Sequence, residues 1–202
     1  MESGKNKKEK IKIVLPKEAK KEPAKHVLAS AKYLSNPHKG SQFENFVVEM
    51  LFSGEGKKLY ELSKKTSDYH NRELKVSDET NTDPDLLIRF KKSQKQFAVE
   101  CKYRSFLWFD DITNKPFIDW CREDQWINYL TYQQRNRTPV FIVIGVGGTP
   151  NKPNEAYCIP LKKIKSTILF DKDLKKYAKG ERRYFRLYWD DNKKNLSWDR
   201  PE

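Results

Sequence analysis

A seven-residue apolar run, Val140–Val146, constrains the fold of this chain more than any other segment. It reads Val-Phe-Ile-Val-Ile-Gly-Val, and most of its residues are β-branched. A run of this kind without polar alternation is typical of a strand that is buried on both faces of a sheet. It is far shorter than the roughly 18 residues that a membrane span needs, so no membrane partner is expected. We therefore predict a buried central strand here.

The segments around this run show the periodicities of helices and strands. The strongest helix is predicted from 40 to 53, because its apolar residues follow the i, i+3, i+4, i+7, i+8 pattern: Phe43, Phe46, Val47, Met50 and Leu51. A second helix is predicted over 123–135, and strands over 59–62, 86–90, 97–104 and 156–159. The order is helix, three strands, helix and two strands. It predicts an α/β fold with a central mixed sheet flanked by helices.

The remaining segments are predicted to be less regular. Residues 63–82 are polar and read as a loop, and 161–164 and 174–179 are short helical candidates. Residues 183–189 and 196–198 predict a C-terminal β-hairpin. The turn at 147–154 follows a strand and is rich in Gly, but its two Pro residues argue against a dinucleotide-binding loop. Residues 105–120 form an aromatic-rich loop, which could pack in the core, stack on bases or form a dimer contact.

Charge divides the chain into two regions. The formal net charge is +13, and residues 1–39 carry 11 Lys and 4 Glu, a net of +7. We predict that 1–39 is a largely disordered basic tail and that 40–202 is one domain, with a core over 40–160 and an extension over 161–202. The tail either aids solubility or follows a phosphate backbone. The domain stays basic without it, which favours a polyanionic partner such as nucleic acid.

Cysteine usage and the N-terminus bear on the compartment. The chain has three Cys and no C-x-x-C, which argues against a disulfide framework and a structural zinc site. The Lys-rich N-terminus has no apolar signal-peptide region, so a cytoplasmic protein is expected.

Two acidic residues and a lysine form the most informative constellation. Asp85 precedes the strand predicted over 86–90, and Glu100 and Lys102 lie on the next strand, over 97–104. Since side chains alternate along a strand, Glu100, Lys102 and Arg104 share one face, and we place this face away from the core. Pairing of the two strands would bring Asp85 alongside Glu100. Along the second strand, the Cβ atoms of Glu100 and Lys102 would be about 7 Å apart.

Such a cluster predicts a cation site. Two converging carboxylates repel each other unless a cation neutralises them, and Mg²⁺ prefers oxygen ligands of this kind. Lys102 could hold a water molecule at that site or help to deprotonate it. The alternative is an ordinary cross-strand salt bridge on a solvated face.

The residues Pro84-Asp85 and Glu100-Cys101-Lys102 resemble the motif of the PD-(D/E)xK nuclease superfamily, which has the restriction-endonuclease-like fold. The resemblance covers roughly residues 40–160 in the order αβββαβ. The stretch Phe-Ala-Val-Glu-Cys-Lys-Tyr-Arg over 97–104 is most similar to the Holliday-junction resolvase and Mrr-type restriction branches. The long polar segment 63–82 departs from the pattern and leaves the position of the first strand open.

The resemblance implies a function and a ligand set. Asp85 and Glu100 would bind Mg²⁺, with Mn²⁺ as a substitute, and the backbone carbonyl of Cys101 would be a further ligand. Lys102 would orient the water that attacks the phosphodiester. The expected activity is a metal-dependent endonuclease acting on DNA, with a homodimer as a possible form. The alternative is a nucleic-acid-binding module of the same fold that has little or no hydrolytic activity.

Several residues are further candidates for this site. Glu44, on the first helix, is either an accessory metal ligand or part of a Ser-x-x-Glu capping box that begins with Ser41. On the second helix Gln125, Gln133 or Gln134 could lie near the site, and an ordinary surface amide is the alternative for each. The residues predicted to contact nucleic acid are Arg104, Gln125, Arg182 and Arg186.

Overall fold

The computed structural model of this chain describes residues 37–66, 83–179, 188–190, 192 and 195–197, and its helices and strands lie in these ranges. Residues 1–36 of the predicted tail, residues 67–82 of the polar segment and all of 180–187 fall outside them. No described helix is both long and apolar enough to cross a membrane.

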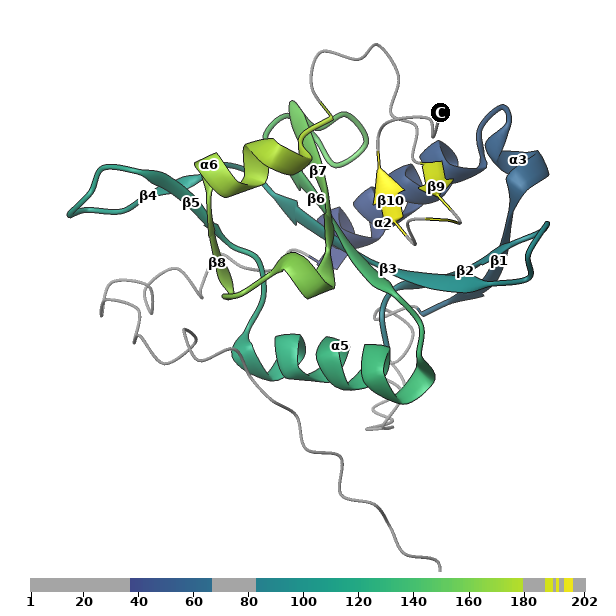
Figure 1. The fold of residues 1–202 in the computed structure, drawn as a ribbon. Coiled ribbons are helices and arrows are strands. Elements are labelled where there is room, and N and C mark those ends of the chain that lie inside the picture. Colours follow the sequence, from purple (N-terminus) through teal and green to yellow (C-terminus); the bar gives the residue numbers. More distant parts are fainter. Residues whose placement is uncertain (1–36, 67–82, 180–187, 191, 193–194, 198–202) are drawn as a thin grey trace, which may run out of the picture.

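A five-stranded mixed sheet forms the centre of the fold (Figure 1). Its order is β1 (Tyr60–Lys65), β2 (Leu86–Phe90), β3 (Gln96–Arg104), β6 (Val140–Val146) and β7 (Glu155–Pro160). β3 and β6 are parallel, whereas every other neighbouring pair is antiparallel. The predicted αβββαβ order and the mixed sheet are confirmed. β1 extends into the segment that was predicted to be a loop, and it follows a short helix, α3 (Gly56–Leu59).

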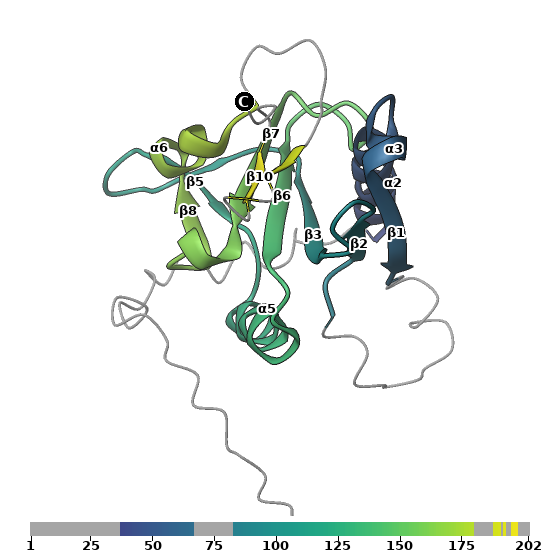
Figure 2. The ribbon, with the colours of Figure 1, turned by 45° about the vertical axis from the view of Figure 1, so that its right-hand side comes forward.

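Helices cover both faces of this sheet. α2 (Pro37–Phe52) packs on one face and α5 (Glu123–Asn136) lies on the other, as Figures 1 and 2 show. Phe141 and Val143 belong to the core under α2, while Ile142 and Ile144 belong to the core on the side of α5. Because both of its faces are buried, β6 has no polar position, which explains the continuous apolar run.

The prediction that one face of β3 points away from the core is wrong. Phe97 and Val99 pack toward α2, as expected, but Ala98, on the opposite face, is also fully buried. Glu100 shares the face of Ala98 and is only 3% exposed. The reason is that α5 and its neighbours cover the second face. The candidate site therefore lies inside the fold, where β2 begins beside the middle of β3.

The first helix begins earlier than the sequence predicts. α2 begins at Pro37, where a proline costs little because the first N–H of a helix has no partner within the helix. Ser41 therefore lies inside the helix and is not its N-cap. The alternative in which Ser41 and Glu44 form a capping box is wrong.

The segment predicted as an aromatic loop contains a hairpin. β4 (Trp108–Phe109) pairs with β5 (Pro116–Asp119), and β5 pairs with β8 (Ile168–Phe170) in a separate three-stranded sheet. Figure 1 shows this hairpin extending from the body of the protein. Strands this short carry too few residues for a visible alternation, so they depend on tertiary pairing.

The C-terminal extension packs back on the core. After β7 come η4 (Leu161–Lys163), β8, α6 (Asp171–Leu174) and η5 (Lys175–Tyr177). β9 (Tyr188–Asp190) and β10 (Asn195–Ser197) are antiparallel, which confirms the predicted terminal hairpin over its described residues. Leu196 is buried in the same core as α2.

Gly145 on β6 provides a test of how tightly α2 packs on the sheet. A Cβ atom at Gly145 would lie 2.4 Å from the Phe43 ring, which is fully buried. Gly145→Ala is therefore expected to lower the free energy of unfolding by about 1–3 kcal/mol, the usual cost of overpacking a core. Urea denaturation measures this change. The control is Gly40→Ala in α2, where a Cβ atom meets nothing within 4 Å. Equal stability of the two variants would contradict this packing.

Candidate functional site

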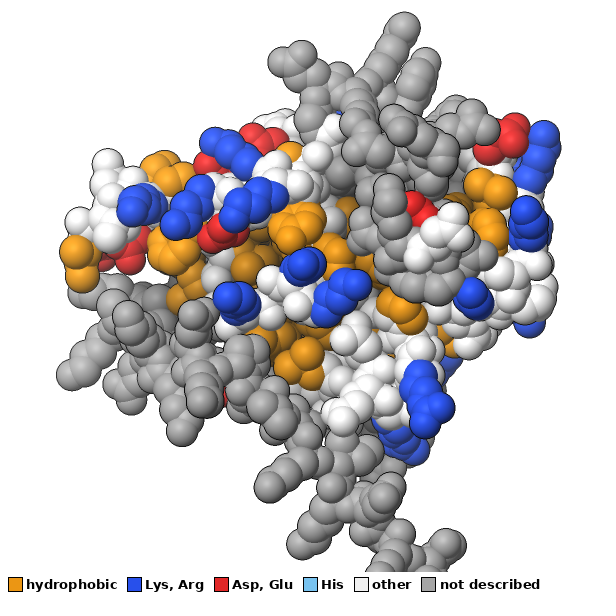
Figure 3. Space-filling model, in the orientation of Figure 1, with side chains coloured by type: hydrophobic (Ala, Val, Ile, Leu, Met, Phe, Trp, Pro, Cys, Tyr) orange, Lys and Arg blue, Asp and Glu red, His pale blue; other side chains and the backbone are white. Residues whose placement is uncertain are grey.

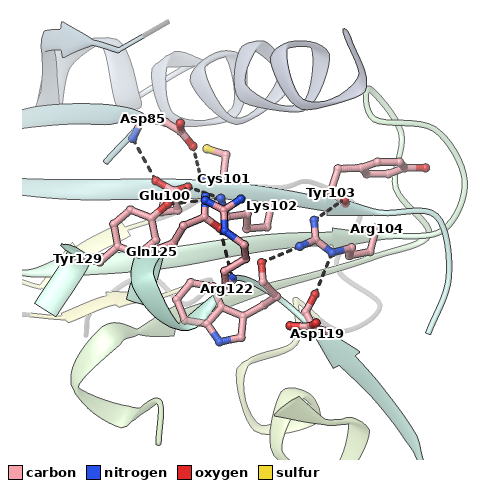
Figure 4. A network of polar contacts seen from close by, with 11 residues as sticks. Asp85, Glu100, Cys101, Lys102, Tyr103, Arg104, Asp119, Arg122, Gln125 and Tyr129 are labelled. Carbon is pink, nitrogen blue, oxygen red and sulfur yellow. Dashed lines mark hydrogen bonds and ion pairs between the residues drawn. The ribbon is translucent and has the colours of Figure 1, made fainter. Parts of the chain in front are cut away.

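The β2–β3 hairpin brings Asp85 opposite Glu100. Leu86 pairs with Val99, so Asp85 lies directly before the paired strand at the level of Glu100. The backbone N–H of Asp85 donates to Glu100 Oε2 at 3.3 Å, and the N–H of Cys101 donates to Asp85 Oδ2 at 2.7 Å (Figure 4). Both carboxylates are buried, with Asp85 9% and Glu100 3% exposed. The proximity that the sequence predicts is therefore present.

Lys102 and Tyr129 complete the cluster. Lys102 Nζ lies 2.6 Å from Glu100 Oε1, and the Tyr129 hydroxyl donates to the same oxygen at 2.6 Å. The ammonium also lies 3.4 Å from the Tyr129 hydroxyl and 5.7 Å from the centre of its ring. Tyr129 comes from α5 and was not among the predicted site residues. The available signal was its place beside Trp126 on the buried face of the helix, which equally indicates ordinary core packing.

Burial and like charge control ionisation in this cluster. Burial, followed by the charge of Glu100, raises the pKa of Asp85 well above its usual value. Burial tends to lower the pKa of Lys102, but the charges of Glu100 and Asp85 outweigh this effect and raise it. Burial and Glu100 also raise the pKa of Tyr129, which keeps its hydroxyl protonated as a donor. At neutral pH Lys102 is thus an ammonium group.

The oxygen atoms of this site fit a hard divalent cation. The donors are the carboxylates of Asp85 and Glu100, and an added positive charge would offset the repulsion that raises the pKa of Asp85. The N–H and C=O groups of one strand residue point toward the same neighbouring strand. Because the N–H of Cys101 donates to Asp85, the carbonyl of Cys101 is directed toward the same side of β3 as Asp85. Within the described ranges no three His, Cys, Asp or Glu side chains are grouped closely enough to hold a metal. Mg²⁺ commonly binds one or two carboxylates and takes its other ligands from water and phosphate.

Glu44 lies near this cluster and adds a third negative charge to its surroundings. Its Oε2 is 3.8 Å from Lys65 Nζ at the end of β1, and Lys65 also donates to Asn45 Oδ1 at 2.5 Å. The charge of Glu44 contributes to the raised pKa of Asp85, after burial and Glu100. Glu44 therefore acts on Asp85 through its charge.

The three glutamines of α5 have different positions. Gln125 Oε1 accepts the N–H of Arg122 at 3.3 Å, at the start of the helix. Gln133 Oε1 accepts the N–H of Val140 at 3.0 Å, which ties the end of α5 to β6. Gln134 is exposed. Two of these amides thus accept backbone N–H groups, and none of the three is hydrogen-bonded to Asp85, Glu100 or Lys102.

Arg104, which was predicted to contact nucleic acid, is hydrogen-bonded to the backbone of the protein. Its guanidinium donates to the backbone carbonyls of Tyr103, Asp119 and Trp120 at 3.1, 3.0 and 2.6 Å. Arg182 and Arg186 lie outside the described residues. On the face shown in Figure 3 the described Lys and Arg side chains are spread out and do not gather in one patch.

The aromatic segment divides into a buried part and an exposed part. Trp120 and Ile118 are fully buried, so for these two residues core packing is the correct one of the three alternatives. Phe106, Phe109 and Ile112 are 50%, 60% and 85% exposed on the β4–β5 hairpin.

Comparison with known proteins gives only distant similarities, all to solved structures. No family model and no curated protein matches the chain. Among solved structures, it is similar to a Holliday junction resolvase, Hjc, from the archaeal hyperthermophile Archaeoglobus fulgidus, with 12% sequence identity and a TM-score of 0.47. The match covers 68% of this chain and 93% of the resolvase. Since the similarity is this low, the fold rests on the topology of the chain's own sheet, and the site rests on its own side chains.

Proposed function

We propose that this protein is an endonuclease that hydrolyses phosphodiester bonds in DNA with Mg²⁺ as its cofactor. The observation that carries the proposal is the meeting of Asp85, Glu100 and Lys102 where β2 begins beside β3. As a purely structural cluster, two buried carboxylates beside a charged lysine would be energetically unfavourable, because burial and like charge oppose ionisation of Asp85. A site that receives a cation and a phosphate explains this arrangement.

Each side chain has a distinct task in this proposal. Asp85, Glu100 and the carbonyl of Cys101 would hold Mg²⁺, which lowers the pKa of a bound water molecule and offsets charge on the phosphate. Lys102 would orient the attacking water through its ammonium N–H groups. Because the charges of Glu100 and Asp85 raise the pKa of Lys102, it serves as a donor and not as the general base. Tyr129 holds Glu100 by donating to Oε1.

The rival proposal is a nucleic-acid-binding module without hydrolysis. Its prediction differs in one respect, since such a module needs no cation at Asp85 and Glu100. The test is calorimetry of the full chain with Mn²⁺, together with incubation of plasmid, junction and single-stranded DNA and of RNA with Mg²⁺ or with a chelator. We expect Mn²⁺ to bind and DNA to be cut only with the metal. Binding of DNA without Mn²⁺ binding or cleavage would support the module instead.

Glu44→Gln tests the accessory role of the first helix. The amide keeps the size of the side chain but removes its charge, which hard cations prefer and which acts on Asp85. We expect nearly unchanged melting, slower cleavage and a higher Mg²⁺ concentration at half-maximal rate. Glu49→Gln, at an exposed position of the same helix, is the control. An Mg²⁺ titration equal to that of wild type would exclude Glu44 from the site.

A further inference from the structure

Arg104 lies at the point where the β4–β5 hairpin leaves the sheet. The chain departs after Arg104, the last residue of β3, and returns at Asp119 and Trp120 on its way to α5. The guanidinium of Arg104 donates to the carbonyls of both returning residues, at 3.0 and 2.6 Å, and to that of Tyr103 at 3.1 Å (Figure 4). One side chain therefore joins the two ends of this insertion.

Trp120 connects this junction to the site. Its ring is fully buried and stacks on Tyr129, with the ring centres 6.1 Å apart and an angle of 29° between the planes. Its indole N–H donates to the Ser166 carbonyl at 3.0 Å, and its backbone N–H donates to the Thr167 carbonyl, also at 3.0 Å. With Arg104 on its carbonyl, Trp120 is held from several directions.

Tyr129 in turn contacts both functional side chains. Its hydroxyl donates to Glu100 at 2.6 Å and lies 3.4 Å from Lys102 Nζ. The contacts thus run without a break from Arg104 through Trp120 and Tyr129 to Glu100 and Lys102. We propose that Arg104 is a positioning residue, which fixes Trp120 against Tyr129 and thereby fixes the side chains of Glu100 and Lys102. This inference rests on the proposed function.

The chemistry of arginine suits this role. The guanidinium is planar, and its N–H groups point in fixed directions, so one group can bind several carbonyls in one arrangement. A lysine ammonium at the same position cannot reach all three carbonyls at once. Nε and both terminal nitrogens of Arg104 each donate to a backbone carbonyl, so the orientation of the guanidinium is fixed by the protein itself.

The test is Arg104→Met, with the rate and KM of DNA cleavage measured separately on the full chain. A small displacement of functional groups reduces rates strongly, so we expect kcat to fall roughly 10- to 100-fold with KM unchanged. A phosphate contact would behave differently, because its loss raises KM and weakens the salt dependence of binding. The control is Arg89→Met, since Arg89 lies on the adjacent strand and pairs with the exposed Glu61 at 2.8 Å.

A double-mutant cycle tests the connection itself. If Arg104 acts through Tyr129, Arg104→Met should reduce kcat much less in a Tyr129→Phe background than in wild type, because coupled residues are not additive. Full additivity of the two losses would overturn the inference. So would a raised KM with unchanged kcat.

If Arg104→Met folds poorly, the inference is tested with a second variant, Arg104→Lys, and with a second measurement, the affinity for Mn²⁺. Both variants are checked by thermal melting, and kinetics are run below the lower transition. We expect Arg104→Lys to retain a kcat between those of Arg104→Met and wild type, and Mn²⁺ affinity to fall in the Arg104 variants but not in Arg89→Met. If wild type cuts DNA and the Arg104 variants match Arg89→Met, the inference alone fails. If wild type neither binds Mn²⁺ nor cuts DNA, the proposed function fails and the inference fails with it.

Discussion

Asp85→Asn is expected to abolish Mg²⁺-dependent cleavage and to raise the thermal stability of the protein at neutral pH. The loss of cleavage follows from removal of a carboxylate that would hold the cation. The gain in stability follows from burial, because Asp85 is 9% exposed and lies beside Glu100, so that its ionised form is disfavoured. An amide at this position is neutral and can still accept the N–H of Cys101 through its oxygen.

The stability gain has a defined pH dependence. The pKa of Asp85 is higher in the folded protein than in the unfolded chain, so between the two values the folded state holds a proton that the unfolded state has lost. The stability of wild type therefore falls as pH rises through this window, and Asp85→Asn does not share this contribution to the fall. Melting curves at several pH values should show an advantage of the variant that grows with pH and then levels off.

Asp83→Asn is the matched control for this experiment. Asp83 is two residues away and pairs with Lys64 at 2.8 Å near the surface, so its substitution should leave cleavage unchanged. Mg²⁺ should raise the melting temperature of wild type and of Asp83→Asn by binding the folded state, and should have no such effect on Asp85→Asn. Cleavage by Asp85→Asn at the wild-type rate would show that the site has been assigned to the wrong residues.

Lys102→Met should also slow cleavage strongly, but with the opposite effect on stability. Loss of the group that orients water and stabilises developing charge is expected to lower kcat roughly 10²- to 10³-fold. The substitution also leaves Glu100, which is 3% exposed, without its cation. Removing one partner of a buried ion pair costs about 3–5 kcal/mol. The hydroxyl of Tyr129 still donates to Glu100, so we expect a loss near the lower end of this range.

A second substitution identifies the cause of that instability. Glu100→Gln in the Lys102→Met background removes the unpaired charge, so stability should largely return while cleavage does not recover. Lys92→Met, in the exposed turn between β2 and β3, controls for loss of a positive charge from the protein. If Lys102→Met cuts DNA as fast as Lys92→Met, Lys102 has no part in the chemistry.

Much of the fold could be predicted from local patterns. The apolar run of β6 requires cover on both faces, and the bounds of β2 agree with the prediction from 86 to 90. Periodicity also identified α2 and α5, whose buried faces contain Phe43, Val47, Trp126 and Tyr129. These elements are long or strongly apolar, so their burial can be recognised without knowledge of what they pack against.

The weaker elements could not be predicted in this way. β4 has two residues and pairs with the nearby β5, whereas β8 has three residues and pairs with β5 across about 50 residues of sequence. The start of α2 was also missed, because the helix was predicted to begin at residue 40 and in fact begins at Pro37. A proline is compatible with both positions, and only the surrounding structure decides between them.

The sequence by itself determined the pairing of β2 with β3, the parity of β3 and the proximity of Asp85 to Glu100, because hydrophobic periodicity and antiparallel pairing are local properties. Only the tertiary structure decided that α5 covers the face of Glu100, so that the carboxylates are buried and Tyr129 reaches them. The tertiary structure also decided that the guanidinium of Arg104 donates to backbone carbonyls. These outcomes depend on contacts between segments far apart in the chain, and neither the spacing nor the type of a single residue specifies which segment will lie against it.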